Sequence, residues 1–221
     1  MILPVPFSTF ASDVLHFPAF PPSFMHLCLF EDNRTGALRP LVETRAAFDL
    51  RLGIRTLAET AWDAFSPDAL LLHTRPLVSA VTAQTHPNAS VNSLPEGADV
   101  LFLNGRFVAA PGAARQHIRD AAQSQKSACA FVKDDTLVAA WMPNASARLP
   151  EDALSTAPFN EELFASLPTT TLADASLVER PWDLLDTLRP ALTRDVAAHT
   201  KGPAEGSLSD RPHASVHESV I

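Results

Sequence analysis

Two acids and four arginines follow the first strongly apolar run of this sequence. The run Leu27–Phe30 ends at Glu31 and Asp32, and the arginines are Arg34, Arg39, Arg45 and Arg51. Open α/β sheets bind ligands at the carboxyl ends of their strands, and guanidinium groups match phosphate oxygens in a bidentate way. The pattern therefore indicates a phosphate site. The alternative is a buried strand followed by a solvated loop.

The loop after this strand offers little phosphate-binding chemistry besides its arginines. It contains only Gly36, and no lysine precedes Lys126, so backbone amides freed by glycine cannot be the main phosphate cradle. Arg39, Arg45 and Arg51 must then carry the charge, and Arg45, after the turn-like Glu43-Thr44, is the best candidate. Pairing of these arginines with the neighbouring acids is the competing interpretation. Glu31 and Asp32 are candidate Mg²⁺ ligands, because carboxylates and phosphates together suit this ion.

Two more polar side chains end apolar runs. Asn104 closes the run 99–103, and its amide could bind a ribose or sugar hydroxyl or hold metal-bound water. A plain turn is the alternative, since Asn-Gly is a strong turn signal. Lys133 ends the run 129–133, from which it could reach a phosphate or stand on the surface of a hairpin about Asp134-Asp135.

Several short motifs of this chain resemble the opening of a known family. They are Phe30-Glu31-Asp32, Leu38-Arg39-Pro40-Leu41, Thr44-Arg45, Phe48-Asp49-Leu50-Arg51 and Gly53. The resemblance is to bacterial sugar nucleotidyltransferases similar to variant UDP-N-acetylglucosamine pyrophosphorylases, which are usually fused to a left-handed β-helix of acyltransferase type. Ala46 departs from the family's usual proline. Leu103–Arg106 and Pro181–Leu184 are weaker matches, and the resemblance runs from about Met25 to Leu185.

This resemblance implies an activity and a set of site residues. A sugar-1-phosphate would attack the α-phosphate of a nucleoside triphosphate and release pyrophosphate. The implied roles are catalysis by Arg45 and Arg39, substrate binding by Arg51, Asn104, Arg106 and Lys133, and Mg²⁺ binding by Glu31 and Asp32. A metal-dependent member often has an aspartate near the end of the 99–103 strand, and this chain lacks it. The rival function is a non-catalytic module that binds a nucleotide-sugar or caps a β-helix, with any activity in an acyltransferase-like domain.

Composition excludes some functional classes. The 221 residues carry a net charge of −8, which argues against a general nucleic-acid binder because those present a basic face. No apolar run approaches the roughly 20 residues of a membrane span, and no basic segment opens a secretory signal. We expect a cytoplasmic protein. Cys28 and Cys129 lie in apolar runs without metal-ligand spacing, which predicts reduced core thiols.

The pattern of apolar runs predicts an α/β fold, a Rossmann-like nucleotide-diphospho-sugar transferase sheet with helices on both faces. Strands are expected at 26–30, 68–73, 99–103, 129–133 and 136–142. Helices are expected at 54–65, 77–81, 116–125, 160–167 and 181–199, the last kinked or split by Pro190. The expected organisation is an extension or mis-start (1–24), a nucleotidyltransferase-like domain (25–200), a linker (201–212) and the start of a β-helix (213–221), through which the full-length protein would form a homotrimer.

Overall fold

The structure, a computed structural model, describes residues 25–124, 127–155 and 157–199. The predictions for the extension, the linker, the β-helix and the trimer lie outside the described residues. Both cysteines are free thiols; Cys28 is buried, as predicted, whereas Cys129 is only partly buried. Among the described segments, no helix is both long and apolar enough to cross a membrane.

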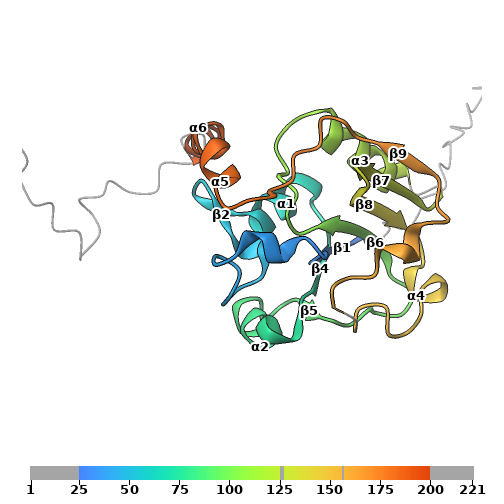
Figure 1. Ribbon diagram of the computed structural model, residues 1–221. Coiled ribbons are helices and arrows are strands. Elements are labelled where there is room, and N and C mark those ends of the chain that lie inside the picture. Colours follow the sequence, from blue (N-terminus) through green and yellow to red (C-terminus); the bar gives the residue numbers. More distant parts are fainter. Residues whose placement is uncertain (1–24, 125–126, 156, 200–221) are drawn as a thin grey trace, which may run out of the picture.

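Seven strands of the described chain form one sheet in the order β5-β4-β1-β6-β8-β7-β9. Their bounds are β1 Met25–Phe30, β4 Ala69–His73, β5 Ser90–Val91, β6 Asp99–Asn104, β7 Cys129–Lys133, β8 Thr136–Met142 and β9 Thr169–Thr171. Strand β1 pairs in parallel with β4 and β6, whereas β8 runs antiparallel to β6 and β7. The predicted α/β sheet is confirmed, and it is mainly parallel with β1 in its interior (Figure 1).

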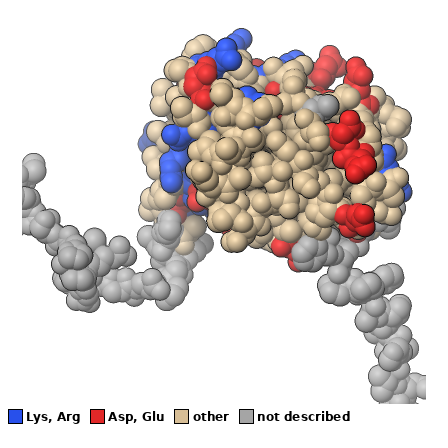
Figure 2. Space-filling view, turned by 90° about the horizontal axis from the view of Figure 1, so that it is seen from below, with Lys and Arg blue, Asp and Glu red and all other residues tan. Residues whose placement is uncertain are grey.

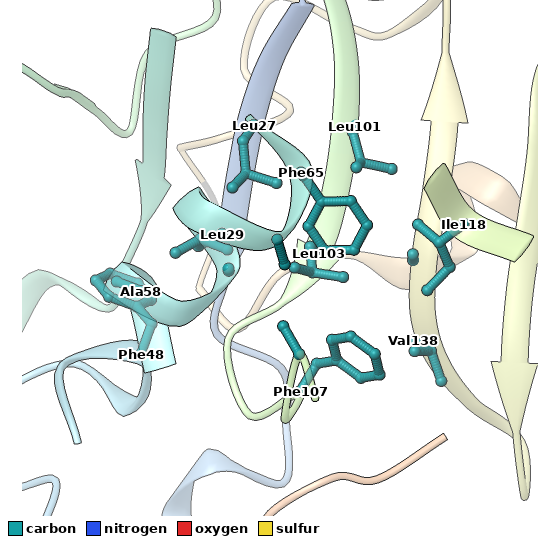
Figure 3. Close-up of a cluster of buried hydrophobic side chains, with 14 of the residues drawn as sticks. Leu27, Leu29, Phe48, Ala58, Phe65, Leu101, Leu103, Phe107, Ile118 and Val138 are labelled. Atoms are coloured by element: carbon teal, nitrogen blue, oxygen red, sulfur yellow. The ribbon is translucent and has the colours of Figure 1, made fainter. Parts of the chain in front are cut away.

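The central strands are largely apolar because both of their faces are covered. Leu27 and Leu29 of β1 face one layer of the core, where helices α1 (Leu57–Phe65) and α3 (Ala113–Ser124) pack (Figure 3). Cys28 and Phe30 face the opposite layer. That layer is closed by the short helix α4 (Ala145–Arg148), the 3-10 turn η3 (Glu161–Phe164) and irregular chain. The prediction of helices on both faces holds, although the second face carries only short ones.

Helix α1 begins at Leu57 because Thr56 and Glu59 form a capping box at its N-terminus. The hydroxyl of Thr56 accepts a hydrogen bond from the Glu59 backbone N–H at 3.1 Å, and the Glu59 carboxylate accepts one from the Thr56 N–H at 2.6 Å. Such a reciprocal pair satisfies two backbone donors that the first turn leaves unbonded. Ile54, predicted to lie in this helix, instead lies in the turn of the hairpin formed by β2 (Arg51–Leu52) and β3 (Arg55–Thr56).

The predicted 181–199 helix is two helices, α5 (Asp183–Asp186) and α6 (Leu188–His199), which lie beside the β2–β3 hairpin (Figure 1). Pro190 stands in the first turn of α6, where a missing N–H costs nothing. Asp195 of α6 is fully buried and accepts hydrogen bonds from the Ile54 N–H at 3.0 Å and from the Arg55 guanidinium at 2.9 Å. The carboxylate thus fastens α6 to the hairpin.

Helix α2 (Pro76–Thr85) follows β4 and carries no charged side chain. Only Val78 and Thr82 are buried, while Leu77 is 72% exposed. Figure 2 views the side of the molecule on which α2 lies. It shows uncharged side chains over the middle of this face, basic ones gathered toward one edge and acidic ones toward the other.

Candidate functional site at the strand ends

Strands β1, β4 and β6 end at one level of the sheet. Phe30, the last residue of β1, is in register with His73 of β4 and with Asn104 of β6. The residues that follow these three ends are therefore neighbours: Glu31-Asp32, Thr74-Arg75 and Gly105-Arg106. A Cβ on Gly105 would lie 3.0 Å from the Phe30 carbonyl oxygen, so a glycine suits this close approach. The carboxyl edge of a parallel sheet is where such folds bind ligands.

Asp32 lies at the centre of a buried polar network. The Arg106 guanidinium donates from Nε to Oδ1 at 3.0 Å and from a terminal nitrogen to Oδ2. The Asn104 amide donates to Oδ2 at 2.9 Å and to the Leu137 carbonyl at 3.0 Å. Both side chains of the Asp32–Arg106 ion pair are 0% exposed. Burial by itself raises the pKa of the Asp32 carboxyl, but Arg106, Asn104 and Thr35 outweigh it and hold that pKa below its usual range.

Glu31 forms a second buried pair, with Arg75 after β4. Its carboxylate accepts hydrogen bonds from the Arg75 guanidinium at 2.7 Å, the Arg75 N–H at 3.1 Å and the Ala47 N–H at 2.9 Å. The same guanidinium donates to the carbonyls of Val42 and Arg45, which ties the loop to the sheet edge. Burial is the largest influence on Glu31 and raises its pKa, and Arg75 offsets this only in part.

The two carboxylates do not fit the predicted Mg²⁺ site. All four of their oxygens already accept hydrogen bonds from protein donors, and each carboxylate is neutralised by a buried or half-buried arginine. Mg²⁺ needs carboxylate oxygens that are free to enter its coordination shell at about 2.1 Å. In the part of the chain that the structure describes, no group of three or more His, Cys, Asp and Glu side chains could hold a metal.

Three hollows surround the loop after β1, and Asn33 lines all of them. The first hollow, of about 290 Å³, lies over Glu31 and is lined by Arg39, Val42, Glu43, Arg75, Pro76, Leu77, Ala157 and Pro158 as well as the loop. The second hollow, of about 360 Å³, is lined by Asn33, Arg34, Gly36, Ala37, Arg106, Glu179 and Arg180. The third hollow, of about 460 Å³, is lined by Asn33 and residues 158–162.

Glu161 gives the third hollow an acidic wall. Its carboxylate accepts a hydrogen bond from the Leu137 N–H at 3.2 Å. Burial raises the pKa of Glu161, and the negative charge of nearby Asp32 raises it further, against the opposing effects of that hydrogen bond, Arg106 and Arg34. The three hollows therefore differ in character: the first is largely apolar with two arginine–glutamate pairs, the second is rich in arginine and the third is acidic.

The structure does not bring the predicted arginines to one place. Arg39 lines the first hollow, where it pairs with Glu43 at 2.9 Å. Arg45 and Arg51 instead line a separate depression beside Asp49, and Arg51 donates to the Ile54 carbonyl. The expectation of a shared phosphate crevice for these three is wrong, because Arg39 lines the first hollow and the other two line a different depression.

The other predicted substrate-binding residues have different surroundings. Asn104 is 1% exposed and belongs to the Asp32 network instead of facing a crevice. Arg106 lies in that network and also borders the second hollow. Lys133 donates to the Ala175 carbonyl at 2.6 Å and lines none of the three hollows.

Sequence reasoning did not assign site roles to Arg34, Arg75, Arg180 and Glu161. A signal existed for Arg75, which follows the predicted strand 68–73 as Glu31 follows the first strand. Arg180 directly precedes the Pro181–Leu184 match, and its position was equally visible. Glu161 gave no signal, because it belongs to a 3-10 turn far along the chain that returns to the sheet edge.

Comparison with known proteins adds a family. The family model described as sugar nucleotidyl transferase matches residues 27–204. A search of curated proteins found no match.

Solved structures with a similar chain path share little sequence. A candidate glucose-1-phosphate thymidylyltransferase of Bacillus anthracis in complex with sucrose is 8% identical, with a TM-score of 0.43, and the match covers 82% of this chain and 98% of that one. A Mycobacterium tuberculosis H37Rv protein in complex with manganese is 12% identical, with a TM-score of 0.46 and coverage of 75% and 98%. A candidate nucleotide-diphospho-sugar transferase of Desulfovibrio desulfuricans G20 is 12% identical, with a TM-score of 0.45 and coverage of 80% and 96%.

Proposed function

The chain belongs to the sugar nucleotidyl transferase family, and from this premise we propose that it joins a nucleotidyl group to a sugar-1-phosphate. In this reaction a phosphate oxygen of the sugar-1-phosphate attacks the α-phosphorus of a nucleoside triphosphate. The bond from that phosphorus to the bridging oxygen breaks, and pyrophosphate leaves with the electron pair. Such a transfer depends on positioning and charge neutralisation more than on covalent catalysis.

The main support for this proposal is the lining of the first hollow. Val42, Leu77 and Pro158 give it apolar walls that suit a nucleobase, and Arg39 and Arg75 add cations at the same place. Glu31 on its floor is paired with Arg75, so the floor does not repel an anionic ligand. Arg39 keeps its proposed contact with substrate phosphate. Arg45 and Arg51 are not part of this proposal, since they line another depression.

Mg²⁺ at Glu31 and Asp32 is likewise not part of the proposal, because both carboxylates are committed to arginines. The pairing of both carboxylates with arginines favours the second candidate function, a non-catalytic module that binds a nucleotide-sugar. Both candidates place the nucleotide in the first hollow and differ only in turnover.

Pyrophosphate release from a panel of nucleoside triphosphates and sugar-1-phosphates tests the proposal. At least one pair should give release that depends on both substrates. Arg39→Ala should reduce kcat/KM by about tenfold or more, the loss expected for a hydrogen bond to a charged group. Arg148→Ala is the matched control, because Arg148 is an exposed arginine that lines none of the three hollows. Nucleotide-sugar binding without release for any pair would favour the binding module.

A further inference from the structure

Two exposed arginines line the second hollow, and hydrogen bonds hold the backbone at each of them. Arg34 stands on the loop after β1, where its N–H donates to Asp32 Oδ1 at 3.2 Å. In the segment that precedes α5, the N–H groups of Glu179 and Arg180 donate to one carboxylate oxygen of Asp183 at 2.7 and 2.8 Å. Neither arginine forms an ion pair with any residue that the structure describes. Both guanidinium groups are therefore available to an anion.

Arg106 borders the same hollow, and hydrogen bonds immobilise its guanidinium. It is 0% exposed, and its Nε and one terminal nitrogen donate to Asp32. Its other terminal nitrogen donates to the Val178 carbonyl at 3.1 Å, and the Val178 N–H donates to the Arg106 carbonyl at 2.9 Å. A guanidinium has five N–H donors. One N–H on each terminal nitrogen of Arg106 is thus not used by these bonds.

Asp32 is one of the two carboxylates that were candidates to hold a divalent cation at this edge, and Arg106 pairs with it. A buried carboxylate requires a positive partner, and here the partner is covalently part of the chain. The guanidinium fixes the geometry through two nitrogens, as it does in bidentate pairs. Arg106 and Asp32 together are neutral, so the positive charge available to an anion in this hollow comes from Arg34 and Arg180.

We propose that the second hollow is a phosphate subsite in which Arg106 pairs with Asp32 in place of a divalent cation, and in which Arg34 and Arg180 contact the ligand. Its ligand is a phosphate or diphosphate group, and it binds without a bridging metal. The assignment rests on the proposed function, because the first and second hollows share Asn33 and Gly36 and one nucleotide would span both.

Pyrophosphate is the probe for this subsite, titrated calorimetrically into the full chain in the presence of EDTA. The wild-type protein should bind it, and replacing EDTA by MgCl₂ should bring no gain in affinity. Arg180→Ala should weaken binding about tenfold or more, whereas Arg148→Ala should stay within about twofold. Binding that requires Mg²⁺, or an Arg180→Ala variant that binds like the wild type, would overturn the proposal.

A second arm measures the metal directly, with Mn²⁺ alone. The wild-type protein should not bind it tightly, because Asp32 is occupied. Arg106→Ala exposes the carboxylate to a new partner, so Mn²⁺ should raise the melting temperature of this variant. Arg55→Ala is the matched control, since it also strips an arginine from a buried aspartate, Asp195, and Mn²⁺ should not rescue it. Tight Mn²⁺ binding by the wild type, or equal rescue of both variants, contradicts the proposal. If Arg106→Ala does not fold even with Mn²⁺, the titrations of the wild-type protein with pyrophosphate and with Mn²⁺ still test the proposal.

The two proposals can fail separately. Metal-free pyrophosphate binding without any turnover keeps the phosphate subsite and rejects the transferase activity. Turnover together with strictly Mg²⁺-dependent pyrophosphate binding keeps the activity and rejects the replacement of a metal by Arg106.

Discussion

Replacement of Asp32 by asparagine tests the energetic role of the buried network. Asp32→Asn keeps the shape of the side chain but removes the charge that pairs with Arg106, and it points amide hydrogens at other donors. Both partners are 0% exposed, and breaking a buried pair on one side costs about 3–5 kcal/mol. We therefore expect the free energy of unfolding to fall by about that amount, which is a large part of the roughly 5–15 kcal/mol of a typical domain.

Urea denaturation at neutral pH measures this loss, with an exposed ion pair as the control. Arg39 and Glu43 are 71% and 47% exposed, so Glu43→Gln should change the free energy of unfolding by less than about 1 kcal/mol. In a double variant, Arg106→Met should recover part of the loss, because an apolar side chain leaves no buried charge unpaired. If the free energy of unfolding of Asp32→Asn lay within about 1 kcal/mol of the wild-type value, the buried Asp32–Arg106 pair would not stabilise the fold as we expect.

The same variant should also change the response to acid. Folding lowers the pKa of Asp32, since Arg106 and its other partners outweigh burial. The folded protein therefore binds this proton less readily than the unfolded chain. The resulting stability is full above the unfolded pKa of about 3.9 and is lost as the pH falls through the lowered folded value. Folding also lowers the pKa of Asp195. Asp32→Asn should therefore reduce the acid sensitivity of the free energy of unfolding without abolishing it.

Three other substitutions test the elements that position the site. Gly53→Ala should destabilise the hairpin by more than about 1 kcal/mol in urea, because Gly53 has φ +85 and an added Cβ would lie 2.6 Å from Asp195 Oδ2. Thr56→Ala should cost about 1 kcal/mol in the same assay by removing the α1 cap. Phe159→Ala should lower the free energy of unfolding by about 3–5 kcal/mol, since the Phe159 ring stacks on the Phe30 ring in the core with 4.6 Å between the ring centroids. A cost under 0.5 kcal/mol for any of them would contradict its stated contact.

The sequence was most informative where structure depends on neighbouring residues. The continuous apolar run of β1 predicted a strand buried on both faces, and Leu27 and Phe30 are 0% exposed. Asp134 and Asp135 predicted the turn between β7 and β8, and both have positive φ, 46 and 59. These features are local, so a single sequence records them.

The sequence was least informative where distant residues pair. Arg106 meets Asp32 across 74 positions of the chain, and no spacing rule links them. Acids and arginines in one loop looked like mutual partners or a common anion site, yet Arg75 and Arg106 arrive from other strands to neutralise Glu31 and Asp32. The strand ends could be predicted as the site, but not which cations would occupy them.

Mass spectrometry of the reaction product tests directly whether the chain joins a nucleotidyl group to a sugar-1-phosphate. The full chain is incubated with a nucleoside triphosphate and a sugar-1-phosphate from the pair that gives the strongest pyrophosphate release or, without release, the tightest nucleotide binding. We expect a nucleoside diphosphate sugar that contains the α-phosphate of the nucleotide and the phosphate of the sugar, and less of it from Arg39→Ala than from Arg148→Ala. Recovery of both substrates unchanged, or of nucleotide hydrolysed without joining to the sugar phosphate, would contradict it.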